Sequence, residues 1–254
     1  MKIRLTLALL LVGLMFNCTI ADEKGLQIAR EADRRDQGFV DNTADMLMVL
    51  KNKQGQTSKR NMRLRTLEQK ADGDKSLVIF DRPRDVAGTA LLTHSHRSGV
   101  DDQWLYLPAL KRVKRIAANN KSGPFMGSEF AYEDLSSQEV DKYKWTFLKD
   151  DGKHYVLERV PNYKGSGYKR QIVWIEKVHY RPMKTEFYDR KNSKLKTLVM
   201  SQYQQYKNKF WRASTMTMVN HQTGKSTVLS WNNYKFGQGL KKNDFTQNKL
   251  KRAR

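Results

Sequence analysis

The segment DDQWLYLPALKRVKRIAANNKSGPFMGSEFAYEDL, residues 101–135, combines a strand pattern, a basic run and a loop rich in aromatic and small residues. Its apolar alternation from Trp104 to Leu107 stops at Pro108, which is typical of a β-strand. The basic run at 111–115 predicts the return strand of a hairpin. The aromatic and glycine-containing part, 125–135, is therefore expected to lie over a sheet rather than within it.

A period of two dominates the chain after residue 40 and predicts a long antiparallel meander. Gly, Asn and Asp separate the alternating stretches, as tight turns require. A sheet of this length must close, curl or split to manage its edges. We therefore predict a mainly β protein with a single strongly curved antiparallel sheet. Besides the hairpin above, strands are expected at 44–51, 62–69, 76–80, 87–93, 144–149, 154–160, 171–180, 185–189, 195–205, 212–221 and 226–234.

Helices are expected to be few. Residues 23–38 place apolar side chains on one side and charged side chains on the other, which predicts an amphipathic helix packed on a sheet. Short helical turns are expected at 128–136 and 243–250. We predict that the N-terminal helix and the short helices cover the concave face.

The first residues indicate export. Lys2 and Arg4 precede an apolar run at 5–16, which is too short to span a bilayer but suits a secretory signal. Cleavage is expected after Ala21, leaving residues 22–254 as one periplasmic domain. The alternative is a lipid-anchored protein with Cys18 as its first residue, but the bulky residues before Cys18 argue against it.

The composition excludes cysteine chemistry and favours anionic partners. Cys18 is the single cysteine, so a chain cleaved after residue 21 has no disulfide, no thiolate metal site and no cysteine nucleophile. The net charge of +22 favours anionic partners such as lipid headgroups or nucleic acid. Export and the lack of an RNA-binding signature or zinc finger favour lipid, so we expect no nucleic acid.

Patterns typical of enzymes are weak. His94 and His96 alternate near Asp101 and Asp102, so a metal site is conceivable, but a lone His-x-His pair is a poor predictor. The sequence has neither a His-Glu-x-x-His motif nor a Gly-x-Ser-x-Gly elbow. We predict no catalytic residue, no metal and no cofactor.

Methionines are frequent on the predicted strands. Methionine is a flexible side chain that fits adaptable apolar sites, although it also fills ordinary protein cores. If the sheet curls without closing, its inner face is an apolar groove. The methionines in question are Met46, Met48, Met62, Met183, Met200, Met216 and Met218.

A family resemblance follows from several short motifs taken together. They are the strand 104–108, the basic run 111–116, Phe125-Met126-Gly127-Ser128, and Phe130 with Tyr132-Glu133-Asp134-Leu135. Tyr180-Arg181-Pro182 and the strand 186–189 add to the set. The whole chain after the signal resembles the outer membrane lipoprotein-sorting protein family, the LolA-like group related in fold to the lipoprotein carriers LolA and LolB.

The resemblance implies an unclosed antiparallel β-barrel whose hollow takes acyl chains. This chain would then be a periplasmic carrier of lipid or acylated lipoprotein, with peripheral membrane contact and an inner-membrane transporter as a partner. The predicted headgroup or partner surface is Lys111, Arg112, Lys114 and Arg115. The predicted groove or lid residues are Met46, Met48, Met62, Trp104, Tyr106, Phe125, Met126, Phe130, Tyr132, Met216 and Met218.

The alternative function is a non-enzymatic periplasmic adaptor. Such a protein would bind an anionic protein, glycan or membrane surface through its basic face and would take no apolar ligand. A filled interior would favour this alternative over a carrier.

Overall fold

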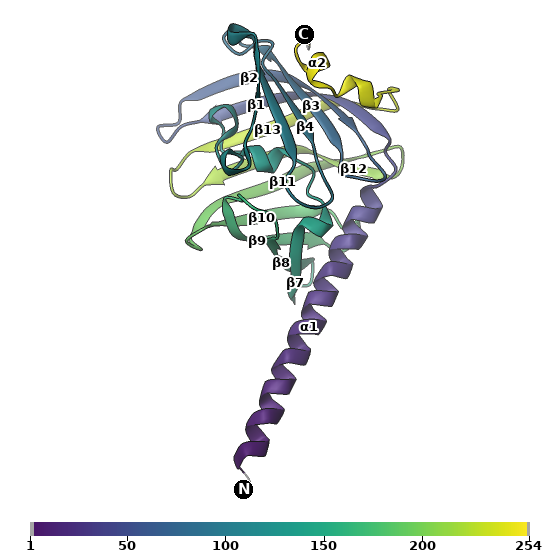
Figure 1. Ribbon diagram of the computed structural model, residues 1–254, viewed down its shortest axis with the longest axis vertical. Coiled ribbons are helices and arrows are strands. Elements are labelled where there is room, and N and C mark those ends of the chain that lie inside the picture. Colours follow the sequence, from purple (N-terminus) through teal and green to yellow (C-terminus); the bar gives the residue numbers. More distant parts are fainter. Residues whose placement is uncertain (1–2, 253–254) are drawn as a thin grey trace.

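The computed structural model describes the backbone of residues 3–252 and the side chains of residues 20–252. One antiparallel sheet of thirteen strands forms the body of the protein, and two α-helices and short 3₁₀ helices pack on it (Figure 1). The side chains of residues 1–19 of the predicted signal segment, Cys18 among them, lie outside those described. The strands are β1 (Asp41–Lys51), β2 (Thr57–Leu67), β3 (Lys75–Arg82), β4 (Ala90–His94), β5 (Asp102–Leu107), β6 (Arg112–Arg115), β7 (Tyr143–Asp150), β8 (His154–Pro161), β9 (Tyr168–Glu176), β10 (Pro182–Asp189), β11 (Lys194–Tyr206), β12 (Phe210–Asn220) and β13 (Ser226–Phe236).

The sheet consists of two meanders joined in the middle. Its strand order is β6-β5-β4-β3-β2-β1-β13-β12-β11-β10-β9-β8-β7, so the pairing of β1 with β13 links the N-terminal and C-terminal halves. β6 and β7 form opposite edges and do not pair with each other. The predicted fold, one curved antiparallel sheet that does not close into a barrel, is confirmed.

The connection between β6 and β7, residues 116–142, is called here the cover segment. Because its two ends attach to opposite edges of the sheet, it must cross the space between them. It contains short 3₁₀ helices but no strand longer than a single bridge between Pro124 and Ala131. The segment packs inside the curve of the sheet, where it is drawn in teal (Figure 1).

The N-terminal helix α1 (Ile3–Asp36) packs mainly on β7 and also contacts β8 and β12. Ile28 and Ala29 of the helix are buried against Trp145 and Leu157. A Cβ atom on Gly25 would lie 2.7 Å from the backbone nitrogen of Phe147, so the helix meets the edge strand too closely for a larger residue. The predicted helix at 23–38 is confirmed over most of that range, and it begins earlier than expected.

The C-terminal segment covers the opposite face of the sheet. Phe245 and Leu250, the latter in α2 (Gln247–Leu250), pack on Leu77, Ile79 and other residues of the convex face. The expectation that all short helices cover the concave face is wrong for this one. The reason is the continuous apolar run of β3, which places Leu77 and Ile79 on the face opposite Val78 and Phe80, and both faces need a cover.

Among the residues described, no helix combines the length and the apolar content that crossing a membrane would require.

Candidate functional site

Most residues predicted to line a groove lie together on the concave face. The strand register explains the grouping, because Met46 is opposite Met62 and Met48 is opposite Leu229, so their side chains share one face. One continuous cluster includes the buried Met46, Met48, Met62, Phe125, Phe130 and Met218 and the half-buried Met126, Tyr132 and Met216. Their role as ligand contacts remains a prediction.

Trp104 and Tyr106 do not belong to this cluster, which corrects the predicted site. In β5 the side chains alternate, and Leu105 and Leu107 face the concave cluster. Trp104 and Tyr106 point to the other face and pack in the cluster that contains Phe245. The alternation was visible in the sequence, but the face that each set occupies was not.

The cover segment fills the hollow with its own side chains. Phe125 is 0% exposed and Phe130 is 2% exposed. The ring of Phe125 lies 5.6 Å from that of Phe80 in the sheet and 5.5 Å from that of Tyr132. In this closed arrangement, the face that would receive an apolar ligand is already buried.

Polar contacts tie the middle of the cover segment to the sheet. The Glu129 N–H donates to Oγ1 of Thr227 at 3.0 Å, and Nδ2 of Asn220 donates to Oε2 of Glu129 at 2.7 Å. Arg60 donates to the carbonyl of Met126. Nε2 of Gln103 donates to the carbonyl of Tyr132 at 2.9 Å, so both arms of the sheet hold the segment.

A buried ion pair lies at the centre of these contacts. Lys196 projects from β11 onto the concave face, and its Nζ is 2.7 Å from Oδ2 of Asp134. The two side chains are only 5% and 7% exposed. Nζ also donates to the carbonyl of Glu129 at 2.9 Å, and Tyr168 donates its hydroxyl to Oδ1 of Asp134 at 2.8 Å. Both acceptors of Lys196 therefore belong to the cover segment.

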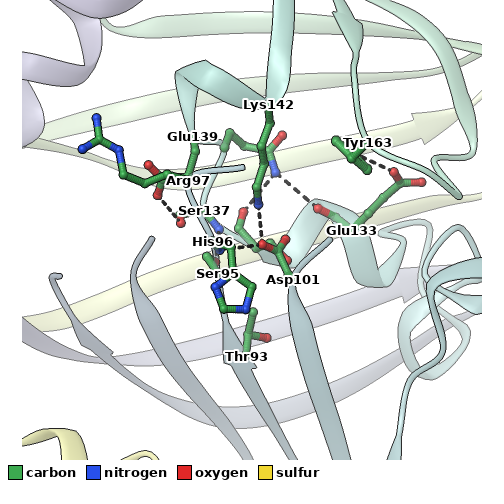
Figure 2. A network of polar contacts seen from close by, with 12 residues as sticks. Thr93, Ser95, His96, Arg97, Asp101, Glu133, Ser137, Glu139, Lys142 and Tyr163 are labelled. Carbon is green, nitrogen blue, oxygen red and sulfur yellow. Dashed lines mark hydrogen bonds and ion pairs between the residues drawn. The ribbon is translucent and has the colours of Figure 1, made fainter. Parts of the chain in front are cut away.

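The two ends of the cover segment converge on Asp101, in the loop between β4 and β5. Lys142 forms an ion pair with the Asp101 carboxylate, as Figure 2 shows, and Lys121 donates to the Asp101 carbonyl. Ser137 N–H donates to Oγ of Ser95 at 3.0 Å in the same loop system. Burial lowers the pKa of Lys121 below its usual value. This clamp fixes the base of the segment independently of its centre.

Glu133 attaches the segment to the loop between β8 and β9. Its carboxylate accepts hydrogen bonds from Gly167 N–H and the Ser166 hydroxyl, both at 2.8 Å, and from the Tyr163 hydroxyl at 3.1 Å (Figure 2 shows Tyr163). Burial, followed by the charge of neighbouring Asp134, raises the pKa of Glu133 above its usual value. A Cβ atom on Gly167 would lie 3.0 Å from Oε1 of Glu133, so a side chain there would crowd this contact.

A pocket of about 280 Å³ opens beside the cover segment. Gly127 and Glu129 of the segment line it together with Leu50 and Thr227 of the sheet. Lys51 and Lys225 add positive charge at its walls. It lies beside Glu129 and therefore reaches the neighbourhood of the buried ion pair.

The predicted basic surface is exposed on the β5–β6 hairpin. Lys111, Arg112, Lys114 and Arg115 are all exposed, and Arg115 pairs with Asp102. Because β6 is an edge strand, its charges also have a structural role: charged side chains on an edge discourage pairing with another chain. A role in binding headgroups or partners stays a prediction.

The histidines considered for metal binding have other partners. Nε2 of His94 is 2.7 Å from the carbonyl of Phe245, and His96, which follows β4, lies between Asp72 at 2.7 Å and Asp102 at 3.2 Å. Within the described part of the chain, no group of three or more His, Cys, Asp or Glu side chains is arranged to hold a metal ion.

Sequence reasoning missed the polar residues that hold the cover in place. Lys196 was one lysine among many on the predicted strands. One usable signal was the alternation of β11, which puts Lys196 on the same face as Leu198. The partner of a buried charge could not be identified, because the contact joins residues 62 positions apart.

Comparisons with known proteins agree with this architecture. A family model described as "Uncharacterized protein" matches residues 72–252. The chain is similar to a crystal structure described as a candidate outer membrane lipoprotein-sorting protein domain from Vibrio parahaemolyticus. The two are 60% identical with a TM-score of 0.88, and the match covers 91% of this chain and 99% of that one.

Two more distant structures share the fold. A DUF1329 family protein from Desulfovibrio piger is 29% identical, with a TM-score of 0.84 over 91% of this chain and 99% of that chain. A LolA superfamily protein from Nitrosomonas europaea is 19% identical, with a TM-score of 0.71 over 89% and 98%. None of the curated proteins compared with the chain matches it.

Proposed function

Because this chain belongs to the outer membrane lipoprotein-sorting protein family, we propose that it is a periplasmic carrier that holds acyl chains of a lipid or lipoprotein against the concave face of its sheet. The observation that supports this most is the construction of that face. It is a continuous apolar surface whose cover is an irregular segment tied by side chains rather than by strand pairing. Such a cover can leave without breaking the sheet.

The size of the open pocket indicates that the cover must move. Its volume of about 280 Å³ is below the roughly 300–1,000 Å³ typical of pockets that bury a drug-sized ligand. A long acyl chain therefore needs the space that Phe125 and Phe130 fill in the closed protein. In the proposed cycle, the acyl chain replaces these two rings on the sheet.

The exchange is energetically reasonable. Exposing two buried phenylalanine side chains costs about 3 to 6 kcal/mol, taking about 1.5–3 kcal/mol for each. Burying ten methylene groups contributes about 8 kcal/mol at about 0.8 kcal/mol each. An acyl chain of about ten carbons or more can offset the exposure of the two rings, whereas a chain of about six cannot offset the upper end of that cost. The polar contacts of the cover segment that break on opening add to the cost and need their own replacement. The role needs no covalent chemistry.

Delivery requires contact with membranes or a membrane protein. The exposed basic hairpin, with Lys111, Arg112 and Lys114, suits an anionic membrane surface or an acidic inner-membrane transporter as donor. Such charges raise the rate of encounter more than the final affinity.

The first test is detergent-free purification from the periplasm, native mass spectrometry and identification of extracted lipid. A carrier is expected to retain lipid or acylated peptide and to take up a fluorescent acyl probe with an affinity that grows with chain length. Leu198→Asn, on the concave face, should weaken uptake. Leu47→Asn is the matched control, because Leu47 is also half-buried but lies on the other face of β1. An empty protein that takes up no acyl probe would overturn the proposal.

One observation favours the adaptor as a second candidate. The concave face of the closed protein is filled by Phe125 and Phe130, as expected for a protein that binds anionic partners through its surface alone. The adaptor predicts binding of anionic vesicles or glycans without any acyl uptake, so the same probe assay separates the two functions.

A further inference from the structure

The concave face contains one buried cation whose acceptors are both on the cover segment. Lys196 is buried and sits among aromatic rings, with the ring centres of Tyr168 and Phe187 each 5.2 Å from its Nζ. Its hydrogen-bond acceptors are the Asp134 carboxylate and the Glu129 carbonyl. Among the residues described, the sheet itself provides no acceptor for this ammonium group.

The surrounding sheet side chains are also arranged to donate to carboxylates of the cover segment. Tyr168 donates to Asp134, and Asn220 donates to Glu129 at 2.7 Å. Two carboxylates of the cover segment therefore occupy a set of donors built by β9, β11 and β12. Apolar rings of the same segment fill the hollow beside them. In chemical terms, the cover segment is an anionic amphiphile bound to its own protein.

Removing the cover segment would leave Lys196 without an anion. An unpaired charge in a buried, apolar site is strongly unfavourable, so removing one partner of a buried ion pair is strongly destabilising. A neutral acyl ligand would not remove that cost. A ligand with a negatively charged head would, because its phosphate or carboxylate can take the position of Asp134 while its acyl chain takes the position of the phenylalanine rings.

We propose that Lys196, with Tyr168 and Asn220, is the anion-binding site for the head of an acyl ligand, and that Asp134 occupies this site in the closed protein. The inference rests on the proposed carrier function and specifies its ligand class: acyl chains with an anionic head. The pocket lined by Glu129 and Thr227 offers the head a polar route inward, and Lys51 and Lys225 favour its entry.

The test compares ligands with the same palmitoyl chain and different heads. Monopalmitoylglycerol is neutral, its phosphate ester carries a phosphate, and palmitate carries a carboxylate. The wild-type full-length protein should bind both anionic ligands at least tenfold more tightly than monopalmitoylglycerol. The ratio between phosphate ester and palmitate tells which anion the site prefers.

Charge variants assign the preference to this site. Lys196→Met should remove most of the preference for anionic heads, and Asp134→Asn should raise the affinity for them because it removes the internal competitor. The double variant Lys196→Met, Asp134→Asn leaves no unpaired charge and keeps the test valid if the single variant folds poorly. It should bind neutral and anionic ligands alike. Lys153→Met, at an exposed turn, is the control and should behave as wild type.

The outcomes separate this inference from the carrier proposal. If no palmitoyl ligand binds the wild-type protein, the carrier function fails and this inference fails with it. If all three ligands bind but without preference for an anionic head, or if the preference survives in the double variant, the carrier stands and the anion site is refuted.

Discussion

The substitution Phe125→Ala tests whether the cover segment competes with an acyl chain for the concave face, because it should change ligand affinity and stability in opposite directions. Phe125 is fully buried, between Phe80 of the sheet and Tyr132 of the segment itself. Replacing a buried phenylalanine by alanine costs about 3–5 kcal/mol of folding free energy. In the carrier mechanism, this loss falls on the closed state alone, because the ring has already left the sheet when an acyl chain is bound.

The expected result is therefore tighter binding by a less stable protein. If the closed state loses about 3 kcal/mol relative to the open state, the open fraction rises by up to about a hundredfold, since each 1.4 kcal/mol is a factor of ten. We expect a fluorescent acyl probe to bind Phe125→Ala about ten to a hundred times more tightly than wild type. The measurements are probe titration and urea unfolding.

Phe245→Ala provides the matched control. Phe245 is 1% exposed and packs on the convex face, so its loss should lower the free energy of unfolding by a similar amount. It should leave probe affinity unchanged. Equal effects of the two substitutions on affinity, or weaker binding by Phe125→Ala, would refute the reasoning that the cover segment and an acyl chain compete for one surface.

Three further predictions concern stability and membrane contact. Gly25→Ala should lower the free energy of unfolding by about 1–3 kcal/mol, because its Cβ would overlap the β7 backbone, whereas the exposed Arg30→Ala should change it by less than about 0.5 kcal/mol in urea titrations. Burial raises the pKa of the Asp74 carboxyl from its usual 3.8 to about 7. Between these two pH values the folded state holds a proton that the unfolded state has released. The contribution of Asp74 to the free energy of unfolding should therefore rise as the pH falls from about 8 to about 4. Asp74→Asn should therefore stabilise the protein most at pH 8 and progressively less towards pH 5; a pH-independent difference would contradict this. Replacing Lys111, Arg112 and Lys114 by alanine should weaken sedimentation with anionic vesicles, most clearly at low salt, without changing acyl-probe affinity; an unchanged vesicle interaction would leave these residues as edge protection alone.

Most of the sheet could be predicted from the sequence because its signals are local. Alternation and turn residues identified each strand, and the hairpin at 104–115 matches β5 and β6 closely. The edge-to-edge path of the cover segment could not be predicted in the same way. It depends on the pairing of β1 with β13, a contact between residues far apart in the chain, which no local pattern specifies.

The residues of the candidate site also differ in whether a local pattern could place them. Met46, Met48 and Met62 could be assigned to one face by period and pairing, but Trp104 and Tyr106 were placed on the wrong face, because alternation defines two sets without telling which set is inside. The Lys196–Asp134 ion pair could not be predicted from the sequence, because the whole fold decides whether a charged side chain is buried.

A reversible lock on the cover segment tests the central claim most directly. Glu129 N–H already contacts the Thr227 side chain at 3.0 Å, so we choose these two positions, in a Cys18→Ser background, for a pair of cysteines meant to join the cover segment to β13 by a disulfide. The account predicts that the oxidised protein takes up no fluorescent acyl probe and that reduction restores uptake. Equal uptake by the oxidised and reduced forms would show that acyl chains do not bind where the cover segment lies, and would contradict the account.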